Sequence, residues 1–324
     1  MSQYRVLIAS RSLRRIPGEH RRVLEQTGCE IIDAPADQRL EGDAMVPLIP
    51  NMDAVIVGTD HVTARVIRAG NKLKVISKYG VGLDAIDLEA ASRAGVVVAY
   101  TPGTSQISVA ELAIGLMFAL ARSIPQHSQI VKSGGWKRIM GVELTGKTLG
   151  IIGLGRNGFE VAQRGHGLQM RVLYYDPLRR PDLEEEGWLT YASLEALLGQ
   201  ADLVTLHCPY MQETANLIGE AELRAMKPSA YLINTARGEI VDEAVLAEAL
   251  REGWIAGAAS DAFVHEPPTG SPLLGLDNFV ACPHVGGATH EAQERTALMA
   301  AQNVVLVLQG RRPLAVANPE VYRP

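Results

Sequence analysis

Three side chains that could bind an anion and move a proton follow separate apolar runs in the last third of the chain. Arg237 lies in N-T-A-R-G, Glu266 in D-A-F-V-H-E-P-P and His284 in P-H-V-G-G-A-T. A planar guanidinium can anchor a carboxylate through paired hydrogen bonds. An imidazole can give a proton to a carbonyl oxygen near neutral pH, and a neighbouring carboxylate keeps it oriented and protonatable. We therefore predict that Arg237, Glu266 and His284 are the catalytic residues.

A glycine-rich turn precedes these residues in the sequence. It reads G-L-G-R-N-G, with glycines at 153, 155 and 158, directly after the strand-like run T-L-G-I-I. The first glycine permits a tight turn, the second lets the backbone approach a pyrophosphate, and the third lets the following helix pack on the strand. The amino end of that helix offers free N–H groups to the anion. The bare pattern could be an ordinary turn, but the strand before it and the helix after it favour a dinucleotide site.

An acidic residue stands where such a site needs one. Asp176 ends the next strand-like run, 23 residues after Gly153. A carboxylate there can accept hydrogen bonds from the ribose hydroxyls of the adenosine. It would also repel the 2′-phosphate of NADP, so the sequence predicts NAD as the cofactor. Arg179 and Arg180 keep NADP open as an alternative, because a nearby arginine can accommodate that phosphate.

The elements that position these residues form two alternating series. In the first hundred residues, apolar runs at Arg5–Ala9, Ala54–Val57, Leu73–Ser77 and Val96–Ala99 alternate with amphipathic segments, which predicts an α/β domain with a parallel sheet. The second series has six strand candidates: Thr148–Gly153, Arg171–Tyr175, Leu203–His207, Tyr231–Thr235, Ile255–Asp261 and Phe279–Cys282. This is the pattern of a Rossmann-type, doubly wound parallel sheet. Ligands bind at the carboxyl ends of such strands, so the three catalytic candidates should face one crevice.

The length of 324 residues fits about two domains, at ~150 residues each. The last helix candidate, Glu291–Gln309, lies beyond the last strand of the second series and could return to the first domain. We therefore predict a discontinuous, smaller, flavodoxin-like substrate domain over 1–101 and 290–324. The NAD-binding Rossmann domain then covers 102–289 and begins with a long apolar helix near 109–122.

Composition excludes several other classes of protein. The net charge of −5 disfavours a broad nucleic-acid footprint, and we interpret the arginines at 11, 14, 15, 21 and 22 as a solvated helix face. The cysteines at 29, 208 and 282 form no C-x-x-C, which argues against a disulfide scaffold or a cysteine zinc site. No signal-like or membrane-spanning apolar stretch is present. We expect a soluble cytoplasmic protein with no metal, nucleic-acid or membrane partner.

At these residues the chain resembles the D-2-hydroxyacid dehydrogenase family, which includes D-3-phosphoglycerate dehydrogenases and glyoxylate/hydroxypyruvate reductases. The likeness covers nearly the whole chain. It includes K-Y-G-V-G-L-D-A-I-D at 78–87, V-A-E-L at 109–112, L-H-C-P at 206–209 and N-T-A-R-G-E-I-V-D-E at 234–243. The resemblance implies an NAD-dependent oxidoreductase that interconverts a small 2-keto acid and its D-2-hydroxy acid. It also implies a homodimer joined near the 109–122 helix.

The resemblance further implies binding residues. Those expected at the cofactor are Gly153, Gly155, Arg156, Asn157, Gly158, Asp176, His207, Cys208, Pro209, Thr214, Thr235, Ala236, Asp261, Gly286 and Gly287. Cys208 would be a wall of the pocket rather than a nucleophile, and His207 has a structural role as its alternative. Those expected at the substrate are Lys78, Tyr79, Gly80, Val81, Gly82 and Ser105. Lys78 could contact a second anionic group, with an ordinary exposed lysine as the alternative.

Departures from the family pattern bear on the substrate. Phosphoglycerate members commonly have an arginine where Gly58-Thr59 stands and an asparagine where Ser105 stands. The alternatives left open are a D-3-phosphoglycerate dehydrogenase of serine synthesis, a phosphite dehydrogenase, which keeps the Arg, Glu and His, and a non-enzymatic NAD-binding corepressor. Formate dehydrogenases are excluded, because they use glutamine where Glu266 stands.

Overall fold

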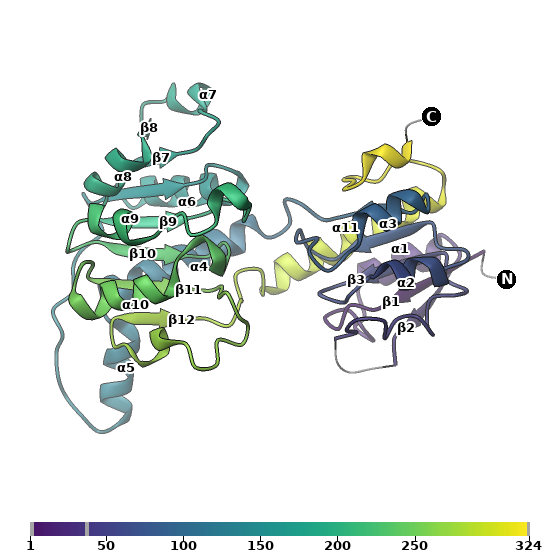
Figure 1. Ribbon diagram of the computed structural model, residues 1–324, viewed down its shortest axis with the longest axis horizontal. Helices are drawn as coiled ribbons and strands as arrows, with labels where there is room; N and C mark the ends of the chain where they lie inside the picture. The colour runs from purple at the N-terminus through teal and green to yellow at the C-terminus, as the bar shows by residue number, and fades with distance from the viewer. Residues whose placement is uncertain (1–2, 36–38, 323–324) are drawn as a thin grey trace. The chain divides into compact units, whose positions relative to one another are not determined.

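The computed structural model describes residues 3–35 and 39–322 (Figure 1). The chain divides into two compact units. Unit 1 combines Met1–Ser105 with His290–Pro324, and unit 2 is Gln106–Thr289. Each unit is an α/β body built on its own parallel sheet, as the alternating pattern predicted.

The sheet of unit 1 has five parallel strands in the order β2-β1-β3-β4-β5. They are β1 (Tyr4–Ile8), β2 (Cys29–Asp33), β3 (Ala54–Val57), β4 (Val75–Lys78) and β5 (Val97–Ala99). This is the flavodoxin-like order, so the predicted class of the smaller domain is confirmed. The sequence did not predict β2, an edge strand that carries Glu30 and Asp33 and therefore lacks a continuous apolar run.

Helices cover both faces of this sheet. They are α1 (Glu19–Gln26), α2 (Ala64–Ala69), α3 (Leu88–Arg93) and α11 (His290–Leu308), and a short 3₁₀ turn, η4 (Pro319–Tyr322), follows them. Leu24 of α1 and Val304 of α11 pack on Ile56 at one face, while α2 and α3 cover the other. Glycine in the left-handed region stops a helix at no steric cost, and α11 ends just before Gly310, whose φ is 73°.

The prediction of a solvated helix face holds for exposed Arg22 on α1 but is wrong for Arg14. Arg14 precedes α1 and is only 8% exposed. It donates from Nε to the carbonyl of Ala9 at 2.8 Å and lies 3.6 Å from the buried carboxylate of Asp60. The prediction failed because the chain turns after β1 and brings this side chain back across the carboxyl ends of β1 and β3.

The sheet of unit 2 has seven parallel strands in the order β12-β11-β10-β9-β6-β7-β8. They are β6 (Thr148–Ile152), β7 (Arg171–Tyr175), β8 (Leu189–Tyr191), β9 (Leu203–Leu206), β10 (Tyr231–Asn234), β11 (Gly257–Ser260) and β12 (Phe279–Ala281). The strand order reverses between β6 and β9, which is the point where doubly wound sheets bind dinucleotides. The sequence predicted six of these strands and missed β8, which has only three residues.

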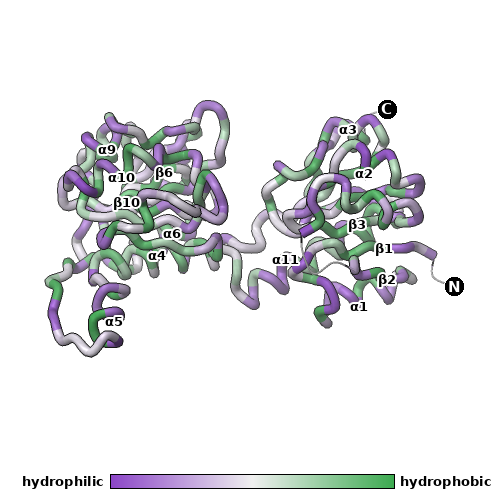
Figure 2. Tube along the Cα trace, turned by 60° about the horizontal axis from the view of Figure 1, so that its bottom comes forward, coloured by the Kyte–Doolittle hydropathy of each residue, from purple (hydrophilic) through white to green (hydrophobic). Residues whose placement is uncertain are grey.

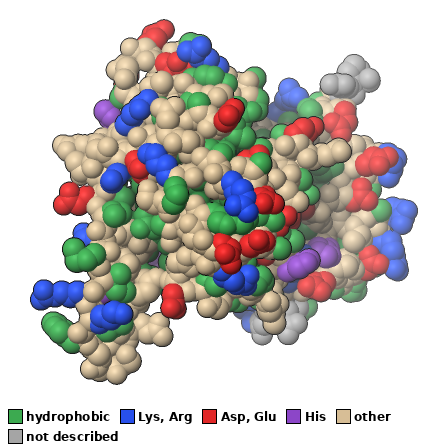
Figure 3. Space-filling view, turned by 60° about the vertical axis from the view of Figure 1, so that its left-hand side comes forward, with side chains coloured by type: hydrophobic (Ala, Val, Ile, Leu, Met, Phe, Trp, Pro, Cys, Tyr) green, Lys and Arg blue, Asp and Glu red, His purple; other side chains and the backbone are tan. Residues whose placement is uncertain are grey.

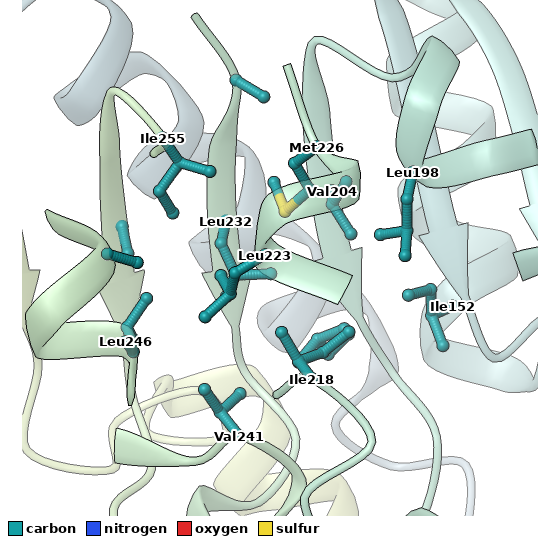
Figure 4. Close-up of a cluster of buried hydrophobic side chains, with 14 of the residues drawn as sticks. Ile152, Leu198, Val204, Ile218, Leu223, Met226, Leu232, Val241, Leu246 and Ile255 are labelled. Carbon is teal, nitrogen blue, oxygen red and sulfur yellow. The ribbon is translucent and has the colours of Figure 1, made fainter. Parts of the chain in front are cut away.

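Two layers of helices enclose this sheet. They are α4 (Gln106–Ala121), α5 (Ile124–Lys132), α6 (Arg156–Gly167), α7 (Pro181–Glu184), α8 (Leu194–Gln200), α9 (Glu220–Ala225) and α10 (Glu243–Glu252), with 3₁₀ turns η1 (Gln212–Thr214), η2 (Gly238–Ile240) and η3 (Pro272–Gly275). Helices α4 and α6 pack on one face. On the other, Leu223 of α9 and Leu246 of α10 lie over Val204 and Leu232 of the sheet (Figure 4).

Helix α5 projects from unit 2 and buries none of its residues (Figures 1 and 2). The sequence analysis did not predict this helix. It is separated from α4 by Ser123, whose φ of 47° breaks the helical path. No single helix in the described part of the chain is long and apolar enough to cross a membrane, and α4 and α5 meet the criterion only as a pair bent by 63°.

Candidate active site

The glycine-rich turn joins β6 to α6 at the centre of the unit 2 sheet. Gly153 has a φ of 93°, and a Cβ there would lie 2.5 Å from the amide nitrogen of Cys208. A Cβ on Gly158 would lie 2.0 Å from the carbonyl oxygen of Gly153, so only glycine lets the helix start this close to the turn. A Cβ on Gly155 would meet nothing within 4 Å. The middle glycine therefore borders open space, where a pyrophosphate would approach the backbone.

The first turn of α6 is open to an anion. Its N-cap residue is Gly155, so no side chain caps the helix. The N–H groups of a first helical turn have no partner within the helix, and the helix dipole adds partial positive charge. Arg156 is exposed and Asn157 is half-buried at this end. These features fit a dinucleotide pyrophosphate, and bound NAD(H) would supply the hydride chemistry of such a site.

Asp176 is held rigidly just after β7. Its Oδ2 accepts from the amide of Leu154 at 2.8 Å, and its Oδ1 accepts from the amide of Leu178 at 2.8 Å. The first bond ties the carboxylate to the glycine-rich turn. Each oxygen keeps a second lone pair for a ribose hydroxyl.

The two arginines that could favour a 2′-phosphate are both paired with carboxylates. Arg179 donates to Glu184 from Nε at 2.9 Å and from Nη2 at 2.7 Å. Arg180 donates to Asp182 from Nε at 3.0 Å and from Nη2 at 2.8 Å. The hydrogen bonds from Arg179 and from the hydroxyl of Tyr174 lower the pKa of Glu184 to about 2.

His284 and Glu266 meet at the carboxyl ends of β12 and β11. The Nδ1 atom of His284 lies 2.9 Å from both carboxylate oxygens of Glu266. An ionised carboxylate can only accept, so Nδ1 carries the hydrogen and Nε2 is left as the reactive nitrogen. Glu266 also accepts from the amide of Phe263 at 3.2 Å, which fixes the carboxylate in its own loop.

Arg237 stands in the loop after β10, and Asn234 shapes that loop. The buried side chain of Asn234 accepts from the amide of Ala236 at 3.0 Å and donates to the carbonyl of Arg237 at 2.8 Å. Arg237 itself donates from Nη1 to the carbonyl of Ala236 at 2.8 Å. Its remaining N–H groups are enough for a paired contact to a carboxylate.

Close backbone contact joins this loop to the loop that carries Glu266. A Cβ on Gly238 would lie 2.1 Å from the carbonyl carbon of Phe263, so glycine is required there. Glu243 accepts from the amide of Val264 at 2.9 Å. Asn234 and Glu243 were not singled out from the sequence. The partners of Asn234 lie two and three residues away, a local turn contact typical of asparagine, whereas the partner of Glu243 is 21 residues away and no local pattern reveals it.

Asp261 links the loops after β11 and β12. It is buried, and its two carboxylate oxygens accept from the amides of Val285 and Gly286 at 2.8 and 2.7 Å. Burial raises the pKa of Asp261, against the opposing effect of these two amides. The residue therefore positions the turn that includes Gly286 and exposed Gly287.

The remaining predicted cofactor residues lie at the ends of β9 and β10. His207 Nε2 lies 2.9 Å from Thr205 Oγ1, and its Nδ1 lies 3.5 Å from Thr235 Oγ1. Burial lowers the pKa of His207 to about 3 and raises that of Cys208 to about 11, so a neutral imidazole stands beside an un-ionised thiol. Thr214 donates to the carbonyl of Pro209 at 2.7 Å and fixes the loop after β9.

The predicted substrate loop follows β4 in unit 1. Gly80 has a φ of 120°, and both its amide and its carbonyl bind the hydroxyl of buried Thr101, at 2.7 and 3.1 Å. Val81 is exposed. Within the described ranges, no backbone carbonyl accepts from the amides of Val81 and Gly82. These two N–H groups are available to an anion, whereas Tyr79 and Ser105 are half-buried beside the loop.

Lys78 is not the exposed lysine that the sequence analysis left as an alternative. It is 7% exposed, and its ammonium donates to the carbonyls of Gly58 at 2.6 Å and Tyr79 at 3.2 Å. A Cβ on Gly80 would lie 3.5 Å from its Nζ. The lysine therefore supports the substrate loop from beneath.

Metal chemistry has no candidate centre in the described part of the chain, where no group of three or more His, Cys, Asp or Glu residues could hold an ion. The cysteines at 29, 208 and 282 are all free.

Comparisons with known proteins agree with this geometry. Residues 114–286 match the family model described as "D-isomer specific 2-hydroxyacid dehydrogenase, NAD binding domain". A glyoxylate reductase of Korarchaeum cryptofilum is 40% identical over 299 residues, covering 90% of this chain and 89% of that protein. A D-3-phosphoglycerate dehydrogenase of Archaeoglobus fulgidus is 44% identical over 272 residues, which cover 83% of this chain and 52% of that protein.

A solved structure extends the likeness to the whole fold. The D-lactate dehydrogenase with NAD⁺ from Lactobacillus jensenii is 28% identical, with a TM-score of 0.80, and the match covers 97% of this chain and 99% of that one. The predictions of an oxidoreductase, of NAD as its cofactor and of a 2-hydroxy/2-keto acid reaction are confirmed. The chain belongs to the D-isomer specific 2-hydroxyacid dehydrogenase family of NAD-dependent enzymes.

Proposed function

We propose that His284 is the proton donor and acceptor of the reaction, that Glu266 orients it, and that Arg237 anchors the substrate carboxylate. The observation that carries this proposal is the contact of His284 Nδ1 with both oxygens of Glu266 at 2.9 Å. The contact leaves Nε2 free to protonate the carbonyl oxygen of a keto acid as it is reduced. In the reverse direction the same atom takes the hydroxyl proton.

Arg237 is the charged anchor for the substrate carboxylate in this proposal. Its guanidinium can form paired hydrogen bonds with that carboxylate. The expectation that the loop at 80–82 also binds the substrate stays a prediction.

For the substrate, we propose a short 2-keto acid with one negative charge, such as glyoxylate or hydroxypyruvate. The ammonium of Lys78 already binds the carbonyls of Gly58 and Tyr79, so it is poorly placed to take a second anionic group. A side chain in place of Gly58 would meet Ser10 Oγ at 2.9 Å, which disfavours the arginine typical of phosphoglycerate members. The likeness to glyoxylate reductases over most of both chains supports the same choice.

The test is NADH oxidation, followed at 340 nm, with glyoxylate, hydroxypyruvate, phosphohydroxypyruvate, phosphonopyruvate and sulfopyruvate. The expected result is the highest kcat/KM with one of the first two acids. A clear preference for a doubly charged acid would overturn the substrate proposal and assign Lys78 to substrate binding. Turnover with none of the keto acids, with phosphite oxidised instead, would overturn the reaction itself.

We further propose that the protein is a homodimer. The loop after α5 exposes large apolar side chains, with Trp136 at 85% and Met140 at 91% exposure, and Ile124 and Val131 of α5 are also exposed. Exposed apolar groups gathered on one projecting segment are typical of a protein–protein contact. Light scattering during gel filtration should give about twice the chain mass of 34.9 kDa. A monomer at micromolar concentration would contradict this proposal.

A further inference from the structure

The segment after β7 contains two arginines of the kind that can bind the 2′-phosphate of NADP. Arg179 and Arg180 follow Asp176 by three and four residues. Asp176 repels a 2′-phosphate, but a guanidinium at this distance along the chain could bind one bidentately. A preference for NAD therefore needs these two guanidinium groups to be kept from the phosphate.

In both arginines, a carboxylate already binds the side of the guanidinium formed by Nε and Nη2. Arg179 binds Glu184 through Nε and Nη2, and Arg180 binds Asp182 through the same two atoms. This side-on arrangement is the geometry with which an arginine would grip a phosphate. Each carboxylate therefore stands where a 2′-phosphate would compete.

The two pairs differ in how firmly they are held. The difference lies in the carboxylate, since Arg179 is itself 59% exposed. The side chain of Glu184 is 17% exposed, and it also accepts from the hydroxyl of fully buried Tyr174 at 2.7 Å. Arg179 lies over the ring of Tyr191, 5.3 Å from the centroid. In contrast, both partners of the Arg180–Asp182 pair are well exposed, and an exposed pair is weak.

We propose that Glu184 is a specificity-determining residue, because its carboxylate holds Arg179 in a bidentate pair and so withholds that guanidinium from the 2′-phosphate of NADPH. Asp182 does the same to Arg180, more weakly. The inference rests on the proposed placement of the adenosine ribose at Asp176. Tyr174 is a positioning residue in this arrangement, because its hydroxyl fixes Glu184 and accepts from the amide of Arg180 at 2.8 Å.

The test compares NADH and NADPH in matched variants. Glu184→Gln should raise kcat/KM for NADPH about tenfold or more, since a charge-assisted pair is released. Its kcat/KM for NADH should change much less, and Asp182→Asn should give a smaller gain with NADPH. Glu185→Gln is the control, because it removes the same charge from the same turn and no described arginine pairs with Glu185.

A second substitution separates the arginine from the loss of charge. Arg179→Ala in the Glu184→Gln background should abolish the gain with NADPH. Competitive inhibition by adenosine 2′,5′-bisphosphate, compared with 5′-AMP, measures the same preference without turnover. If Glu184 merely stabilises the segment between β7 and β8, binding of both nucleotides should weaken together, which would overturn the proposal.

Other outcomes are equally decisive. An equal gain in Glu185→Gln, or a gain that survives Arg179→Ala, would overturn the role of Glu184 while leaving the placement of the ribose at Asp176 intact. A wild-type enzyme that already prefers NADPH would overturn the placement at Asp176 and the specificity role together. A gain confined to Glu184→Gln and dependent on Arg179 supports the proposal.

Discussion

At the scale of single residues, the contact between His284 and Glu266 occurs at a left-handed backbone position. His284 has a φ of 54°, a left-handed conformation that is uncommon for residues other than glycine, although histidine adopts it more often than most. Such strain persists only where the surroundings impose it. Here Asp261 holds the next two amides, and Glu266 holds the imidazole. The contacts at this turn therefore fix the backbone and the orientation of the His284 imidazole.

His284→Ala should lower kcat by roughly 10²- to 10⁴-fold, the usual contribution of a general acid–base group. NADH binding, measured by fluorescence titration, should survive, because the glycine-rich turn and Asp176 are untouched. Arg237→Ala is the informative comparison, since it should raise KM for the keto acid as well as lower kcat. Near-normal turnover in His284→Ala would remove this histidine from the mechanism.

The sequence singled out polar side chains near strand ends better than it singled out the residues that shape the loops around them. Arg237, Glu266 and His284 could be proposed as catalytic residues because each follows an apolar strand-like run, and the structure brings Glu266 and His284 into contact. Glu243 could not, because it accepts from a backbone amide 21 residues further along the chain. The burial of Lys78 was equally hidden, because its ammonium depends on a carbonyl 20 residues away.

At the scale of elements, the junction of β6 and α6 depends on glycines for different reasons. Gly158→Ala would put a Cβ 2.0 Å from the carbonyl oxygen of Gly153 and should destabilise the fold by at least about 1–3 kcal/mol. Gly155→Ala meets nothing within 4 Å and has a φ of −75°, so it should fold normally. Its methyl group should nevertheless weaken NADH binding, because the pyrophosphate must approach the backbone there.

Urea unfolding and NADH titration of the two variants distinguish these roles. The expected pattern is a loss of stability confined to Gly158→Ala and a loss of affinity without a loss of stability in Gly155→Ala. Unchanged NADH affinity in Gly155→Ala would show that the pyrophosphate lies elsewhere.

Strong apolar runs could be predicted from the sequence, and weak ones could not. Buried β3 is a continuous apolar stretch, and buried β9 is apolar except for Thr205. Edge strands β2 and β8 are short or partly charged, so their pairing depends on a neighbouring strand rather than on their own composition. Helix α5 is short and buries none of its residues, so no packing against unit 2 accompanies its few apolar side chains.

At the scale of the whole molecule, the free energy of unfolding should depend on pH. Basic and acidic side chains are interspersed on the face shown in Figure 3, so no large surface of one charge sets this dependence there. A specific contribution comes from His207, whose pKa falls to about 3 on burial from an ordinary value of 6.5. The unfolded chain therefore binds one more proton at this histidine between about pH 3 and pH 6.5.

Stability should consequently decline as the pH falls through that window, by at most about 1.4 kcal/mol per pH unit from this group. Buried His20 contributes with the same sign, because burial also lowers its pKa. Urea midpoints at pH 7 and pH 5 measure the effect, and His207→Gln should flatten the difference. An equal difference in wild type and His207→Gln would assign the pH dependence to other groups.

The division of unit 1 into two stretches of chain has a consequence for synthesis on the ribosome. Unit 2 lies wholly between Ser105 and His290, so it can be completed while unit 1 still lacks α11. Until then, the face of the first sheet that Ala300 and Val304 cover is without its last helix. At ~5–20 residues per second, the nascent chain would hold this apolar face open for roughly 10–40 s. A chaperone that binds exposed aliphatic surface should therefore associate with the early chain and leave once α11 has emerged.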